Sequence, residues 1–157
     1  MLALGLMAAA PAQAAPLDLT CTGSQTLNYS PGLKLVPAPV TVSGSGTFNC
    51  LSTDPSLTGG GFTVPPNVSE LGCALTGGGG TFTYHWNNGN TSTITANSVV
   101  TFSLGAVQVV STGTVISGQF TGDAAVFTWT GTSPGLLDCL SPKGVMQYSG
   151  ATVLEFI

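Results

Sequence analysis

Hydrophobic residues occupy every second position in many short stretches of the chain, a spacing that predicts β-strands. Clusters of Gly, Pro and Asn separate these stretches, and no long segment has the period of a helix. We therefore expect eight or nine strands arranged as an antiparallel, immunoglobulin-like β-sandwich, with a β-barrel as the alternative. The alternation is clearest over residues 17–21, 40–42, 82–86, 100–104, 107–109, 125–129 and 153–156.

One hairpin can be predicted down to its register. A two-residue turn would place the aromatic face of its first strand opposite the polar face of the second. A three-residue loop over 87–89 instead pairs Tyr84 with Ser92 and keeps Trp86 on the same inner face. Because a slip of one residue would expose that whole face, the hydrophobic pattern selects the longer loop. His85 then points outward.

The chain divides into a leader and one domain. Residues 1–14 form an apolar run that closes on Ala12-Gln13-Ala14, the pattern of a signal-peptide cleavage site, although no Lys or Arg precedes the run. The run is shorter than the roughly 20 residues that cross a bilayer, so we expect no stable membrane insertion. Residues 15–157 are expected to form a single secreted, extracellular domain.

Four cysteines in an exported domain indicate two disulfides, for which three pairings exist. The strands on either side of a Pro-rich turn near Leu35 would bring Cys21 opposite Cys50. The predicted bridges are thus Cys21–Cys50 and Cys73–Cys139. A zinc site is the competing interpretation, but no Cys-x-x-Cys pair is present to supply two ligands from one turn.

Charged residues make up only 5% of the chain: two are basic, six are acidic, and the net charge is −4. Nucleic-acid binding requires several Lys or Arg side chains to neutralise phosphates, which two cannot provide. The same shortage excludes attraction to anionic membrane surfaces. The exposed strand positions are expected to carry Thr, Ser and Asn instead.

No motif indicates catalysis, a cofactor or a metal. The Gly-x-Ser-x-Gly match at 131–135 fails as a nucleophile elbow, because Pro134 lacks the backbone N–H that would stabilise an oxyanion. His85 is the only histidine and has no adjacent acid in the predicted hairpin. The acids lack the local pairing that glycoside hydrolysis needs, and we interpret them as solvated or turn-forming groups. They are Asp18, Asp54, Glu70, Asp123, Asp138 and Glu155.

Aromatic residues offer one candidate ligand surface. Tyr84, Trp86 and Trp129, with His85 beside them, could form an exposed platform for sugar rings. The competing interpretation places the three rings in the core, since they alternate in phase with Val, Ile and Phe. We favour the core.

Several turn motifs resemble a group of small secreted proteins common in actinobacteria, and the likeness covers nearly the whole domain. The motifs are Cys21-Thr22-Gly23, the segment 29–33 (Tyr-Ser-Pro-Gly-Leu), His85-Trp86-Asn87-Asn88-Gly89 with Ser92-Thr93, and the segment 113–123 (Gly-Thr-Val-Ile-Ser-Gly-Gln-Phe-Thr-Gly-Asp). The resemblance implies an extracellular all-β domain with paired cysteines. The family has no assigned activity, so no functional residues carry over.

These features predict a secreted binding or structural module that is not an enzyme. The expected partners are an extracellular protein, a glycan or a second copy joined through an edge strand. The alternatives are a small-molecule carrier, a carbohydrate-binding sandwich and a protease inhibitor that uses an exposed loop such as 52–66.

Overall fold

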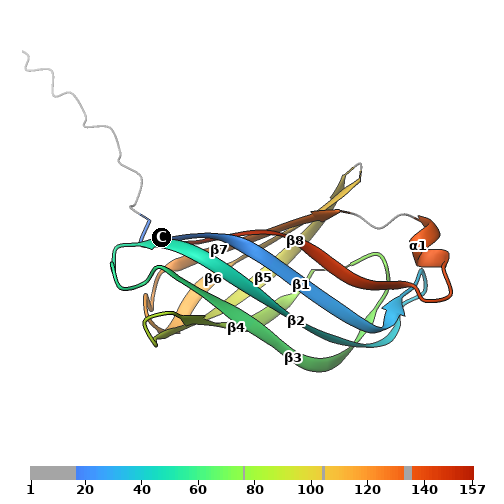
Figure 1. The fold of residues 1–157 in the computed structure, drawn as a ribbon, viewed down its shortest axis with the longest axis horizontal. Helices are drawn as coiled ribbons and strands as arrows, with labels where there is room; N and C mark the ends of the chain where they lie inside the picture. The colour runs from blue at the N-terminus through green and yellow to red at the C-terminus, as the bar shows by residue number, and fades with distance from the viewer. Residues whose placement is uncertain (1–16, 76, 104, 133–135) are drawn as a thin grey trace, which may run out of the picture.

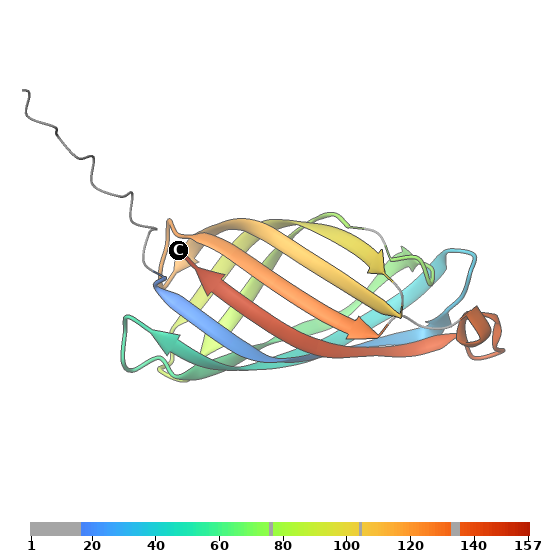
Figure 2. The ribbon, with the colours of Figure 1, turned by 90° about the horizontal axis from the view of Figure 1, so that it is seen from above.

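The computed structural model describes residues 17–75, 77–103, 105–132 and 136–157. Eight antiparallel strands form a closed barrel in which each strand pairs with the next and the last returns to the first (Figure 1). Figure 2 shows the strands winding around the barrel axis. The strands are β1 (Leu19–Leu33), β2 (Ala38–Ser52), β3 (Gly59–Leu71), β4 (Gly79–Trp86), β5 (Thr91–Ser103), β6 (Ala106–Gly118), β7 (Ala124–Thr132) and β8 (Val145–Phe156).

The barrel replaces the expected sandwich. Strands β1 and β8 pair from Leu19 opposite Phe156 to Asn28 opposite Gln147, so the two strands that an open sheet would leave as edges are joined. Closure removes the free edges on which the expected self-association through an edge strand depended. The proposed signal segment, residues 1–14, lies outside the described residues, as does Leu104, the last residue of the alternating stretch 100–104.

The alternation predicted from the sequence sets which side chains face inward. Leu19, Ile94 and Leu154 are fully buried in the barrel, while Thr and Ser side chains alternate with such residues on the outside. The predicted hairpin register is confirmed, because Tyr84 lies opposite Ser92 and Gly89 adopts a φ of 85° in the turn.

Both disulfides are present in the pairs expected from the sequence. Cys21 and Cys50 are directly opposed on β1 and β2, with Cα atoms 4.1 Å apart. Cys73 and Cys139 join the segment after β3 to α1 (Leu136–Leu140), with Cα atoms 6.2 Å apart. This five-residue helix was not predicted. Within the described ranges, no helix is long and apolar enough to cross a membrane.

Glycines on the inner faces of strands make room for large rings. A Cβ atom at Gly60 would lie 2.6 Å from Cε3 of Trp86 on the paired strand, and one at Gly150 would lie 2.7 Å from Nε1 of Trp129. The glycine run at 59–61 and the pair Pro65-Pro66 belong to the Gly and Pro clusters that were expected to separate strands, but both lie within β3. Such residues suit a strand where another side chain needs the space of a Cβ or where the ladder is interrupted.

Hydrogen bonds between loops close the C-terminal end of the barrel, opposite α1 in Figure 1. The Gln119 side chain links three loops: its Nε2 donates to Asp54 Oδ2 at 2.7 Å, and its Oε1 accepts from Asn88 Nδ2 at 3.1 Å. Phe120 adopts a positive φ of 65° and packs on Phe156, with ring centroids 6.1 Å apart. A bulky residue held in this backbone region is strained, so the loop conformation is imposed by its surroundings.

Candidate ligand-binding cavity

An apolar cavity of about 230 Å³ lies inside the barrel. Eight of the eleven residues that line it are apolar or aromatic, and three are polar. They are Leu27, Val42, Phe62, Val64, Phe82, Tyr84, Val109 and Phe127, with Gln25, Ser98 and Ser111.

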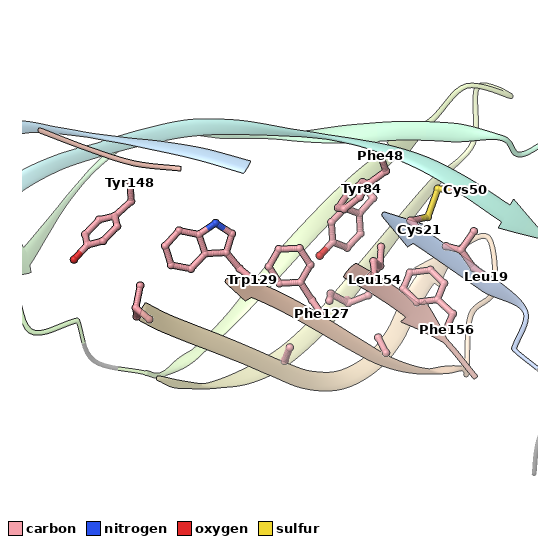
Figure 3. Close-up of a cluster of buried hydrophobic side chains, with 14 of the residues drawn as sticks. Leu19, Cys21, Phe48, Cys50, Tyr84, Phe127, Trp129, Tyr148, Leu154 and Phe156 are labelled. Atoms are coloured by element: carbon pink, nitrogen blue, oxygen red, sulfur yellow. A yellow bond between two sulfur atoms is a disulfide. The ribbon is translucent and has the colours of Figure 1, made fainter. Parts of the chain in front are cut away.

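Aromatic rings form much of the cavity wall. Phe62 meets Tyr84 and Phe127 edge to face, with centroids 5.7 and 6.2 Å apart, so the rings brace one another. Figure 3 shows Phe127 and Tyr84 between two further groups of side chains along the barrel. Trp129 and Tyr148 pack together on the α1 side, and Phe156 lies on the C-terminal side. Buried side chains therefore flank the cavity in both axial directions.

Few polar groups face this space, and none of the lining residues is charged. The hydroxyls of Ser98 on β5 and Ser111 on β6 hydrogen-bond to each other with their Oγ atoms 2.6 Å apart. Gln25 contributes an amide that can both donate and accept. Burial raises the pKa of the Tyr84 phenol above its ordinary range, so it stays protonated. An ionic ligand would gain no partner here.

The barrel wall is incomplete next to the cavity. Strands β3 and β4 pair only at Gly60–Trp86 and Gly61–His85 among the described residues, whereas every other neighbouring pair of strands has a longer ladder. A second hollow, the outer groove, runs along this seam between β3 and β4. It is lined by Phe62, Thr63, Val64, Pro65, Asn67, Thr81, Phe82, Thr83 and His85.

The candidate ligand surface predicted from the sequence is divided by the barrel wall. Trp86 and Trp129 are buried, and Tyr84 faces the interior cavity, so the three rings form no outward platform for sugars. His85 is exposed on the opposite face of β4, in the outer groove. The favoured interpretation of the three rings as core residues agrees with this arrangement.

The structure also places the candidate catalytic groups. Asp18 and Asp123, far apart in the sequence, come together at the C-terminal end, and neither lines the cavity. Burial, then the hydrogen bond and negative charge of Asp18, raise the pKa of Asp123. No group of three or more potential metal ligands occurs in the described parts of the chain. The serine of the Gly-x-Ser-x-Gly match, Ser133, lies outside them.

Sequence reasoning missed the residues that β3 contributes to the cavity. Phe62 and Val64 stand between a glycine run and a proline pair, where no alternating stretch was recognised. Phe62 and Val64 are themselves two positions apart, and this spacing was the one indication in the sequence that they share a face of a strand.

The comparisons with known proteins give no relative. The chain matches no protein-family description, none of the curated proteins and none of the solved structures.

Proposed function

We propose that this protein binds a small, uncharged, predominantly apolar molecule inside its barrel and acts as a secreted carrier or scavenger of that molecule. The interior cavity carries the proposal. Barrels of eight strands have interiors that side chains just fill or that hold one small ligand. Here the side chains leave about 230 Å³ unfilled next to Phe62, Tyr84 and Phe127.

The cavity volume limits the size of the ligand. An engineered apolar cavity of about 150 Å³ holds benzene, while pockets for drug-sized molecules start at about 300 Å³. A cavity of about 230 Å³ lies between the two. The expected ligand is therefore a molecule with one or two rings, or a short branched hydrocarbon chain.

The lining determines the chemistry of the ligand. Transferring an ion into an apolar cavity without a partner is strongly unfavourable, and no charged side chain lines this one. Gln25 and the Ser98–Ser111 pair can accommodate one or two polar atoms. Catalysis is not part of the proposal, because these groups include no nucleophile with an adjacent base.

Two disulfides support an extracellular setting, since such bridges persist in oxidising compartments. The apolar segment at residues 1–14 supports export. A rigid, weakly charged barrel with an apolar interior would keep an apolar molecule dissolved outside the cell.

The direct test is a titration of the oxidised protein with 1-aminonaphthalene, whose emission shifts to the blue and intensifies in apolar surroundings. We expect saturable binding of one probe per chain, with competition by naphthalene. Unchanged probe emission at protein concentrations up to the millimolar range, together with no heat of binding for naphthalene in calorimetry, would overturn the proposal.

Two neighbouring valines provide a matched pair of variants. Val109 lines the cavity, whereas Val110, the next residue on β6, points to the other side of the wall. Val109→Phe should occupy part of the space and weaken probe binding by about tenfold or more. Val110→Phe should leave binding unchanged. Equal effects of the two substitutions would place the probe elsewhere on the protein.

A further inference from the structure

The cavity and the outer groove share a boundary. Phe62, Val64 and Phe82 line both hollows, so the two hollows adjoin at these three side chains. Phe82 lies over Gly80, where an added Cβ would be 3.1 Å from its ring, and 37% of its surface is exposed. A large hydrophobic ring that faces both the cavity and solvent marks a thin part of the wall.

The backbone does not seal this boundary. Beyond Gly61 and His85, β3 and β4 have no ladder between them in the described residues. Pro65 and Pro66 lack backbone N–H groups, so this part of β3 is a poor template for an added strand. The seam is thus suited to a small molecule rather than to an extended peptide.

The two hollows differ in chemistry. The cavity is largely apolar, whereas the groove presents the hydroxyls of Thr63 and Thr81 and the exposed imidazole of His85. Each of these groups can donate and accept hydrogen bonds. Water also reaches them, so a polar group in the groove keeps its solvation.

From this geometry we infer that the ligand is a small amphiphile that lies across the β3–β4 seam. Its apolar body fills the cavity, and an uncharged hydrogen-bonding head, such as a hydroxyl, extends past Phe82 into the outer groove. This inference rests on the proposed function and narrows it, because it specifies a two-part ligand and the direction in which that ligand points.

A matched pair of probes tests the orientation. 1-Propylnaphthalene and 2-(1-naphthyl)ethanol have nearly the same shape and differ by a terminal methyl or hydroxyl group. Their affinities are measured by displacement of 1-aminonaphthalene from the oxidised protein. If the whole probe lay in the cavity with its hydroxyl among the apolar side chains, the hydroxyl would lower the affinity by about tenfold or more. A hydroxyl held inside by Gln25 or by the Ser98–Ser111 pair would instead be insensitive to a substitution in the outer groove. With its head in the groove, the alcohol should bind at least as tightly as the hydrocarbon.

Two threonines provide the matched variants. Thr81 lines the groove, and Thr95 is its paired neighbour on β5, also exposed but outside the groove. Thr81→Phe should obstruct the groove and make the alcohol bind about tenfold more weakly than the hydrocarbon. The hydrocarbon's own affinity should stay unchanged. Thr95→Phe should leave both affinities as they are.

The outcomes separate this inference from the proposed function. If the alcohol binds about tenfold more weakly than the hydrocarbon in the unmodified protein, or if Thr81→Phe leaves their ratio unchanged, the seam orientation is wrong and the carrier function stands. If the hydrocarbon, the alcohol and 1-aminonaphthalene all fail to bind, both proposals fail.

Discussion

The Oγ atoms of Ser98 and Ser111 lie 2.6 Å apart on neighbouring strands, in the wall of a cavity that is otherwise mostly apolar. Each hydroxyl gives the other a hydrogen-bond partner where apolar side chains offer none. Their mutual hydrogen bond therefore allows two polar side chains to lie in this apolar wall.

Replacing both serines should lower the free energy of unfolding by less than the sum of the two single replacements. Ser98→Ala leaves the buried Ser111 hydroxyl unpartnered and should lower the free energy of unfolding by about 1–2 kcal/mol. The double Ala variant removes both hydroxyls, so we expect it to be about 1 kcal/mol more stable than the sum of the two single effects implies. Urea denaturation of the four proteins measures this coupling. Strict additivity would mean that the two hydroxyls do not depend on each other.

Gly60 should resist substitution because Trp86 occupies the space of its missing side chain. A Cβ there would collide with the backbone carbonyl oxygen of His85 and lie 2.6 Å from the indole. Gly60→Ala should lower the free energy of unfolding by about 1–3 kcal/mol. Gly78, where an added Cβ meets nothing within 4 Å, is the control. If Gly60→Ala and Gly78→Ala unfold at the same urea concentration, the indole does not lie over Gly60.

Local patterns were sufficient to predict most of the strands and the β4–β5 hairpin, but not β3 or the closure of the barrel. Alternation determines which side chains share a face, and the match of Tyr84 with Ser92 followed from that alone. A sandwich and a barrel show the same alternation and turns. The difference lies in whether β1 pairs with β8, a contact between the two ends of the domain that no local pattern encodes.

The cavity was also beyond prediction from the sequence, although several of its residues were correctly expected in the core. Tyr84 and Phe127 alternate with other apolar residues and are buried as expected. Whether a void remains depends on the side-chain volumes of all strands together, because a ring from one strand can occupy the space that a glycine leaves on another. Phe62 over Gly46 is one such case.

Two aspartates at the C-terminal end should give stability opposite dependences on pH. The pKa of Asp123 is raised, by burial first and then by Asp18, so folding favours its protonated form. Its contribution to stability is therefore present below the ordinary aspartate pKa and is lost as pH rises through the raised value. Asp123→Asn should increase stability at pH 7, by up to about 1 kcal/mol because water screens this partly exposed pair.

Asp54 provides the control of opposite sign. Its pKa is lowered by hydrogen bonds from the hydroxyl and backbone N–H of Ser56 and from the amide of Gln119, so folding favours the carboxylate. That contribution is present above the ordinary aspartate pKa and is lost as pH falls through the lowered one. Asp54→Asn should thus reduce stability at pH 7. Melting temperatures recorded from pH 3 to 8 compare the two variants, and shifts in the same direction would contradict the assignment.

All three tyrosines of the chain should resist ionisation in the folded protein. Burial raises the pKa of Tyr148 to about 12 and those of Tyr29 and Tyr84 further, with the Tyr148 charge adding to the effect at Tyr29. Folding favours each neutral phenol, so this contribution to stability is complete below the ordinary tyrosine pKa and is lost as pH rises through the folded values. Tyrosinate absorbance should therefore stay low through pH 10–11 in the native protein.

In urea the same chain should titrate with a midpoint near pH 10, as expected for free tyrosine side chains. Tyr148→Phe should remove the earliest native step, because Tyr148 has the smallest shift of the three. A native titration that coincides with the one in urea would show that the rings are accessible to water and that the barrel interior is not as closed as described.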